Sequence, residues 1–118
     1  MRNRDLMSQG TLETAVATGE TGPVVHLVGE ADLTSAARLS ALLTAQLSDG
    51  TRQLTIDMSG LRFADSASVR ALVLTARALR ERGGSLLLLR PQPQVARVLE
   101  LLGADQVVTI RGTGAASP

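Results

Sequence analysis

Hydrophobic residues follow two alternating spacings along this chain, one typical of strands and the other typical of helices. Short apolar or alternating stretches predict five strands, at residues 12–17, 24–28, 54–58, 86–89 and 106–110. Apolar residues three or four positions apart predict three helices, which lie between residues 32 and 49, between residues 65 and 83, and at 92–102. The order β-β-α-β-α-β-α-β predicts an α/β domain with a mixed sheet of about five strands and helices packed on it, because helical crossovers join parallel strands.

Turn and cap residues separate these segments. Gly19–Pro23 predicts a hairpin turn, so the first two strands are expected to be antiparallel. Asp32–Ser35 offers N-caps for the first helix, and Gly103 follows directly after the last helix. The pair Gly83-Gly84 is interpreted as a helix C-cap, because a phosphate-binding P-loop requires a Lys and the chain has none.

We expect a single domain over residues 11–110, because 118 residues suffice for one hydrophobic core but not for two. The polar residues 1–10 predict a flexible N-terminal segment, and the Gly/Ala/Ser-rich residues 111–118 predict a flexible C-terminal tail. With one Phe and neither Trp nor Tyr, the core must be aliphatic.

Composition argues against several classes of function. The chain has no Cys and its only histidine is His26, so neither a metal nor a cofactor site is predicted. All 12 basic residues are Arg, but the net charge is only +1, and dispersed charge without aromatic stacking residues argues against nucleic-acid binding. The longest apolar run, Leu86–Leu89, is too short for membrane insertion, and no signal peptide is evident, so a cytoplasmic protein is expected.

The tetrapeptide Asp65-Ser66-Ala67-Ser68 places hydroxyl groups at a predicted helix start. Asp and Ser are preferred N-cap residues, so one interpretation is purely structural. A second interpretation is that Ser66 accepts a phosphate, since the free N–H groups and the dipole of a helix start stabilise added negative charge. A serine hydrolase is the third, but the chain lacks a G-x-S-x-G motif, and His26 lies inside a predicted strand, where a structural role is expected.

The helix after Ser66 offers a candidate contact surface. Its inward-facing residues are predicted to be Val69, Leu72, Val73, Ala76 and Leu79. Helical spacing then puts four residues on the opposite side, Arg70, Leu74, Arg77 and Glu81. An exposed Leu between two Arg residues suits contact with a protein partner, although a single exposed Leu is also ordinary.

Four blocks of sequence occur in an informative order. Leu54–Ala67 combines an apolar strand, an Asp-hydrophobic-Ser-Gly turn and an Asp-Ser pair before a helix. Gly29–Asp32 reads Gly-Glu-hydrophobic-Asp, and Arg82–Leu86 and Val98–Ala104 follow later. Over residues 11–110, these blocks resemble the signatures of the STAS domain family, specifically the bacterial anti-sigma-factor antagonists.

This resemblance implies a partner-switching regulator and not an enzyme. In the family, an anti-sigma factor that is itself an ATP-binding serine kinase phosphorylates the Ser after the Asp, here Ser66 beside Asp65. The unphosphorylated protein binds the kinase and frees a sigma factor. The phosphorylated protein dissociates from the kinase, and a phosphatase then removes the phosphate. The resemblance also implies that the turn containing Gly29, Glu30 and Asp32 forms part of the partner surface.

The chain departs from the family pattern directly after the Asp-Ser pair. The family has Gly-Leu-Gly where this chain has Ser68-Val69-Arg70. Arg70 lies four residues after Ser66, so it is placed either to pair with a phosphate there or to obstruct the usual kinase. Ser68 is a second, weaker acceptor candidate.

The predicted partner surface therefore comprises Gly29, Glu30, Asp32, Asp65, Ser66, Ser68, Arg70, Leu74 and Arg77. The expected function is that of an anti-sigma-factor antagonist switched off by phosphorylation at Ser66. The alternative is a STAS scaffold that is not phosphorylated, such as a subunit of a signalling complex or an accessory of a membrane transporter. A homodimer is compatible with either function.

Overall fold

The structure, a computed structural model, describes residues 11–48 and 50–112. Its strands are β1 (Leu12–Thr18), β2 (Pro23–Ala31), β3 (Gln53–Ala64), β4 (Ser85–Leu89) and β5 (Thr109–Arg111). Its helices are α2 (Leu33–Ala45), α3 (Ser66–Glu81), α4 (Pro93–Leu101) and the short 3₁₀ helix η2 (Ala104–Gln106). The segments expected to be flexible at residues 1–10 and 113–118, and the helix stop at Asp49, lie outside the described residues.

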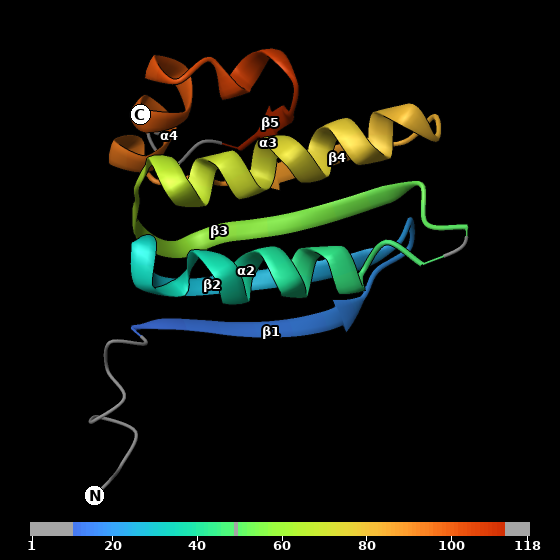
Figure 1. Cartoon of the computed structure of the whole chain (residues 1–118), viewed down its shortest axis with the longest axis horizontal. Coiled ribbons are helices and arrows are strands. Elements are labelled where there is room, and N and C mark those ends of the chain that lie inside the picture. The colour runs from blue at the N-terminus through green and yellow to red at the C-terminus, as the bar shows by residue number, and fades with distance from the viewer. Residues whose placement is uncertain (1–10, 49, 113–118) are drawn as a thin grey trace, which may run out of the picture.

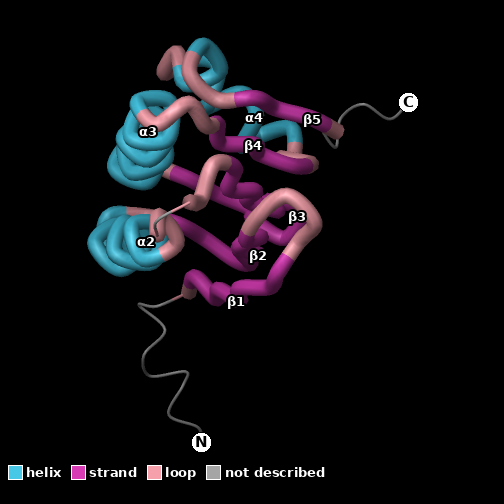
Figure 2. Tube along the Cα trace, turned by 90° about the vertical axis from the view of Figure 1, so that its right-hand side faces the viewer, coloured by secondary structure: helices cyan, strands magenta, loops and turns pink. Residues whose placement is uncertain are grey.

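The five strands form one mixed sheet in the order β1-β2-β3-β4-β5. β1 pairs with β2 in antiparallel orientation, and β2, β3, β4 and β5 are parallel to one another. This arrangement confirms the predicted α/β class and the predicted hairpin. α2 and α3 lie side by side along one face of the sheet, and α4 lies at the end of the sheet where α2 and α3 begin (Figures 1 and 2).

The core lies between the sheet and the helices, and it is aliphatic as predicted. Alternate residues along β2, β3 and β4 turn toward the helices. The largest fully buried side chains are Leu27, Leu39, Leu43, Leu54, Ile56, Met58, Leu61, Leu72, Leu79, Leu86, Leu88 and Leu99. Phe63, the only aromatic residue, is instead 47% exposed near the end of β3. Among the described helices, none is long and apolar enough to cross a membrane.

Two segments that were predicted to be turns belong to long strands. β3 continues through Ser59 and Gly60 to Ala64, and Gly29 to Ala31 forms the last part of β2. The parallel pairing of β2 with β3 supplies hydrogen-bond partners to both segments, which is why neither turns away. Two register shifts in this pairing accommodate the irregular stretch.

The last strand starts later than predicted. Gly103 takes a left-handed φ of 74° directly after α4, as its predicted position requires. The chain then forms η2, in which the amides of Val107 and Val108 both donate to the carbonyl oxygen of Ala104. These bonds move the start of β5 to Thr109. Arg111 therefore pairs with β4 and belongs to the sheet, although it was predicted to lie in the flexible C-terminal tail.

The end of α3 confirms the C-cap interpretation of the two glycines. Gly83 has a left-handed φ of 80°, and the amide of Gly84 donates to the carbonyl oxygen of Leu79 at 2.7 Å, which is a Schellman arrangement. The next amide, that of Ser85, donates to the carbonyl oxygen of Arg52 at 2.8 Å. Gly84 therefore lies against the Arg52 backbone, and a Cβ atom there would overlap that carbonyl oxygen.

We predict that Gly84→Ala lowers the free energy of unfolding by roughly 2–3 kcal/mol, because the added methyl group forces the first residues of β3 and β4 apart. Gly103→Ala is the matched control, since its Cβ would meet nothing within 4 Å and only the left-handed backbone opposes it. We expect that control to lose only about 1 kcal/mol. Urea unfolding followed by circular dichroism measures both losses, and equal losses would contradict the predicted overlap.

Candidate functional site

Ser66 lies where two helices begin side by side. β2 ends at Ala31, one residue before the cap of α2, and β3 ends at Ala64, one residue before the cap of α3. The amide of Asp65 donates to the carbonyl oxygen of Ala31 at 3.1 Å, which carries the pairing of β2 and β3 up to the helix start. Because the two strands are parallel, their helices start at the same end of the sheet (Figure 1).

An aspartate caps each of the two helices. Oδ1 of Asp65 accepts hydrogen bonds from the amide of Ser68 at 3.0 Å and from its hydroxyl at 3.1 Å. Oδ1 of Asp32 accepts from the amide of Thr34 at 2.9 Å and from its hydroxyl at 2.6 Å, and Ser35 completes a capping box. The hydroxyl of Thr34 is the main cause that lowers the pKa of Asp32. The N-cap interpretation is thus confirmed for both aspartates.

Capping by Asp65 leaves the hydroxyl of Ser66 without a hydrogen-bond partner in the described part of the chain. Ser66 is exposed as the first residue of α3. Ser68 differs, because its side chain is only 1% exposed and its hydroxyl is held by Asp65. Of the two serines, Ser66 alone presents its hydroxyl at the surface.

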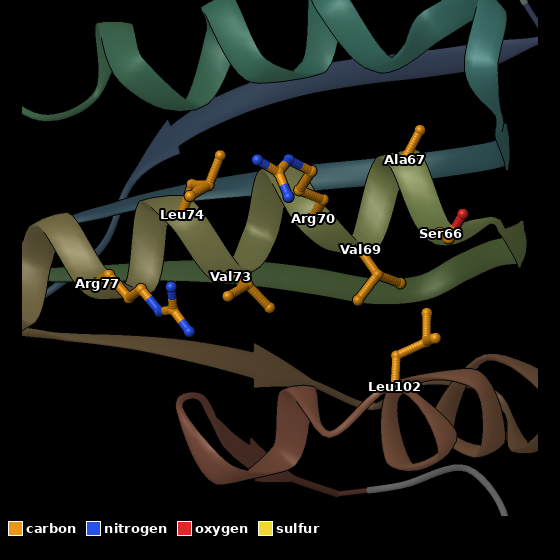
Figure 3. Close-up of a pocket in the computed structure, with 8 residues that line it drawn as sticks. All are labelled: Ser66, Ala67, Val69, Arg70, Val73, Leu74, Arg77 and Leu102. Carbon is orange, nitrogen blue, oxygen red and sulfur yellow. The ribbon is translucent and has the colours of Figure 1, made fainter.

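A shallow groove of about 440 Å³ runs beside Ser66, between α3 and the residue that follows α4. Its lining includes Ser66, Arg70, Leu74 and Arg77 from the predicted partner surface, together with Leu102 (Figure 3). Leu74 is 48% exposed and Leu102 is 50% exposed. Half-exposed leucines bordered by arginines suit contact with a protein better than the binding of a small polar molecule.

The other predicted partner residues gather at the same end of the sheet, but two of them are buried. Asp32 and Glu30 are partly exposed, and Glu30 forms an ion pair with Arg62 at 3.6 Å. Gly29 and Ser68 are both buried. The buried Ser68 side chain cannot reach a partner on the folded domain, and Gly29 has no side chain to offer.

Sequence reasoning missed three exposed apolar residues near Ser66. The last helix was predicted to include Leu102, but it ends at Leu101, and Leu102 is half-exposed as the C-cap residue. Leu33 is 75% exposed directly after the cap of α2, and Phe63 is 47% exposed beside the end of β2.

His26 lies on the sheet face opposite α2 and α3, as the burial of its neighbours Val25 and Leu27 shows. Its Nδ1 atom is 3.0 Å from Oδ2 of Asp57, and the guanidinium of Arg90 is 3.4 Å from the same oxygen. Burial opposes the charged form of Asp57, but hydrogen bonds from Ser59 and the charge of Arg90 outweigh it and lower its pKa. His26 is therefore bound in a polar cluster and cannot serve Ser66 as a base.

Comparison with known proteins identifies the family. The family model described as Mlab, STAS domain matches residues 14–110. The chain belongs to the STAS domain family. BtrV of Bordetella bronchiseptica, a candidate anti-sigma factor antagonist, is 35% identical to this STAS domain over 80 residues, which are 68% of this chain and 69% of BtrV. The anti-sigma-B factor antagonist of Staphylococcus aureus is 26% identical over 86 residues, 73% of this chain and 80% of that protein.

Solved structures of anti-sigma factor antagonists share the fold of this STAS domain. One from Mycobacterium paratuberculosis superposes with a TM-score of 0.74 at 27% identity and covers 84% of each chain. Unphosphorylated SpoIIAA superposes with a TM-score of 0.72 at 22% identity, over 88% of this chain and 92% of SpoIIAA. At that lower identity, the likeness to SpoIIAA shows the fold alone.

We predict that Asp65→Ala lowers the free energy of unfolding by about 1–2 kcal/mol, because the start of α3 loses its cap and the buried Ser68 hydroxyl loses its acceptor. Asp65→Asn is the matched control, since the amide oxygen still accepts from the Ser68 amide. Thermal unfolding compares the two variants. A loss in Asp65→Asn as large as that in Asp65→Ala would show that charge, and not capping, supplies the stability.

Proposed function

We propose that this STAS domain is an anti-sigma factor antagonist that binds an anti-sigma kinase, frees a sigma factor and is released when Ser66 is phosphorylated. The observation that carries the proposal is the exposed Ser66 hydroxyl, which has no hydrogen-bond partner among residues 11–48 and 50–112 and opens onto a half-apolar groove. Relatives that cover most of the chain are anti-sigma factor antagonists, which supports the same class of function here.

The proposed chemistry requires little of the chain itself. A kinase transfers the phosphoryl group of its ATP to Oγ of Ser66, and the kinase supplies the groups that handle the proton and the charge. The chain has only to present the hydroxyl on a rigid element. A hydrolase would need a base beside Ser66, whereas the only histidine, His26, is paired with Asp57 on the other face of the sheet. We therefore assign the domain a binding role and not a catalytic one.

The start of α3 is suited to carry a phosphate without unfolding. Its first turn contains no acidic residue, and the helix dipole favours negative charge at this end. Asp65 keeps its own bonds to Ser68, so a phosphate on Ser66 would leave the cap intact. The added charge of roughly −2 would act instead on a protein that covers the groove. A separate phosphatase would reset the switch, and because the kinase uses ATP, we place the cycle in the cytoplasm.

The second candidate is a STAS scaffold that is not phosphorylated, in a signalling complex or as an accessory of a membrane transporter. The position of Arg70 favours it, because a large cation borders the groove one turn after Ser66. A kinase adapted to the Gly-Leu-Gly pattern of the resembled family would meet this side chain when it approaches the hydroxyl. The two candidates differ in whether Ser66 is ever modified.

We predict that ATP and the partner kinase add one phosphate to the chain and that Ser66→Ala abolishes this addition. Each anti-sigma kinase of the source genome is incubated with the chain, and intact-mass spectrometry counts the phosphates. Ser40→Ala, which removes an exposed hydroxyl from α2, is the matched control and should be phosphorylated like the wild type. Absence of phosphate with every kinase would favour the scaffold, and phosphate on Ser66→Ala would assign the acceptor to another residue.

We predict that Ser66→Asp weakens binding to the kinase by roughly tenfold or more, because a carboxylate enters the surface that the partner covers. Ser66→Asn adds nearly the same volume without the charge and should bind more tightly than Ser66→Asp. Isothermal titration calorimetry compares the affinities. If Ser66→Asp bound as tightly as the wild type, negative charge at this position would not be what releases the partner.

A further inference from the structure

Arg70 lies between two grooves on the outer surface of the helices. It borders the groove that contains Ser66 and Leu102, and it also borders a second groove between α2 and α3, whose lining includes Ala36, Ala37 and Leu74. Ala36 and Ala37 border this groove on the α2 side, and Leu74 borders it on α3. A protein that covers Ser66 therefore covers Arg70 as well, because the two residues line one groove a single helical turn apart.

Arg70 is unneutralised in the described part of the chain. Several other arginines have a partner: Arg38 donates to the Leu12 carbonyl oxygen, Arg62 and Arg90 pair with carboxylates, and Arg82 donates to the Ser48 carbonyl oxygen. No hydrogen bond or ion pair of the described residues involves Arg70. Its charge is thus available to a group that arrives from outside.

The two helices beside Arg70 carry arginines but almost no acidic side chain. α2 contains no acidic residue, and α3 contains none before Glu81, its last residue. Arg70 and Arg77 border the Ser66 groove on either side of Leu74. A cation that is covered by a partner without a counter-charge weakens the complex strongly, so a stable partner must place carboxylates opposite this row.

The direction of the Arg70 side chain leaves room for a second ligand. Figure 3 shows the guanidinium extended along α3 toward Leu74 and away from the hydroxyl of Ser66. A phosphate on Ser66 would lie on the same helix face four residues earlier, within reach of a rotated arginine side chain. Guanidinium–phosphate hydrogen bonds are charge-assisted and stronger than those between neutral groups.

We propose that Arg70 is the electrostatic element of the switch: it binds a carboxylate of the partner when Ser66 is unmodified and the phosphate when Ser66 is phosphorylated. Phosphorylation then removes the counter-charge on which the complex depends, and it also places a negative group opposite the partner's carboxylates. This proposal rests on the proposed function, and it adds that the partner's contact surface is acidic. The sequence difference at residue 70 would then select which anti-sigma factor binds.

Binding to the purified anti-sigma kinases of the source genome tests the first half of the proposal. We expect the affinity of the wild type to fall as NaCl rises from about 50 to about 300 mM. Arg70→Ala should weaken binding roughly 30-fold or more, and Arg70→Glu should weaken it further. Arg80→Glu makes the same charge change on α3 outside both grooves and should alter affinity by no more than about threefold.

The outcomes separate this proposal from the proposed function. If the wild type bound none of the kinases, that result would overturn the proposed function and this inference with it. If the wild type bound a kinase and folded Arg70→Ala and Arg70→Glu bound it with equal affinity, that result would overturn the inference alone. So would an equal loss in Arg80→Glu, because overall charge and not residue 70 would then govern binding. Circular dichroism of each variant establishes that it is folded, and Arg70→Gln replaces Arg70→Glu if the latter is not.

The second half is tested without any partner, on chain with phosphoserine incorporated at residue 66 during translation. The ³¹P NMR shift is followed against pH in the wild-type background and in Arg70→Ala. Pairing with a guanidinium favours the dianion, so we expect the pKa of the phosphate to lie below its ordinary value of about 6 and to rise in Arg70→Ala. Identical titrations in the two backgrounds would overturn the exchange of ligands at Arg70.

Discussion

The parallel pairing of β2 with β3 brings the starts of α2 and α3, and Ser66 with them, to the same end of the sheet. It continues past the strands to the bond between the Asp65 amide and the Ala31 carbonyl oxygen, so the caps of α2 and α3 are neighbours. Both helices then run back along the same face of the sheet and present their outer surfaces together. Without this pairing, Ser66 and the surface of α2 would not belong to one contact area.

Stability and regulation are divided between adjacent residues at the start of α3. Asp65 supplies the cap, and Ser66 supplies the hydroxyl. If the Ser66 hydroxyl itself capped the helix, a phosphate there would replace an interaction that contributes about 1 kcal/mol to folding. Because the Asp65 carboxylate makes these bonds instead, the proposed phosphate on Ser66 would not remove a cap hydrogen bond. Ser68 is buried, and its hydroxyl is hydrogen-bonded to the capping Asp65, so a kinase could not reach it on the folded domain.

Much of this arrangement could be predicted from local patterns in the sequence. Hydrophobic spacing located all five strands and three helices, and Asp32, Asp65 and the Gly83-Gly84 pair were correctly read as caps. The errors arose where pairing between distant segments, or a short 3₁₀ turn without a hydrophobic pattern, decides the structure. Nothing in the local sequence shows that Ser59 and Gly60 will stay paired with β2, or that η2 will delay the last strand. The exposure of Leu102 likewise depends on where α4 ends against α3, which periodicity cannot specify.

The chemistry of arginine decides which signal such a surface can respond to. A guanidinium remains protonated at any pH at which the domain is folded, so the charge of Arg70 is constant. A serine phosphate carries most of its second charge above a pH of about 6, so it too varies little near neutrality. The exchange proposed at Arg70 therefore depends on whether Ser66 is modified, and hardly on pH. His26, the only histidine of the chain, lies on the opposite face of the sheet, where it pairs with Asp57. A glycine at residue 70, as in the resembled family, would leave the phosphate to act by bulk and repulsion alone, whereas under the exchange proposed above the arginine would add a competing ligand and make release of the partner more complete.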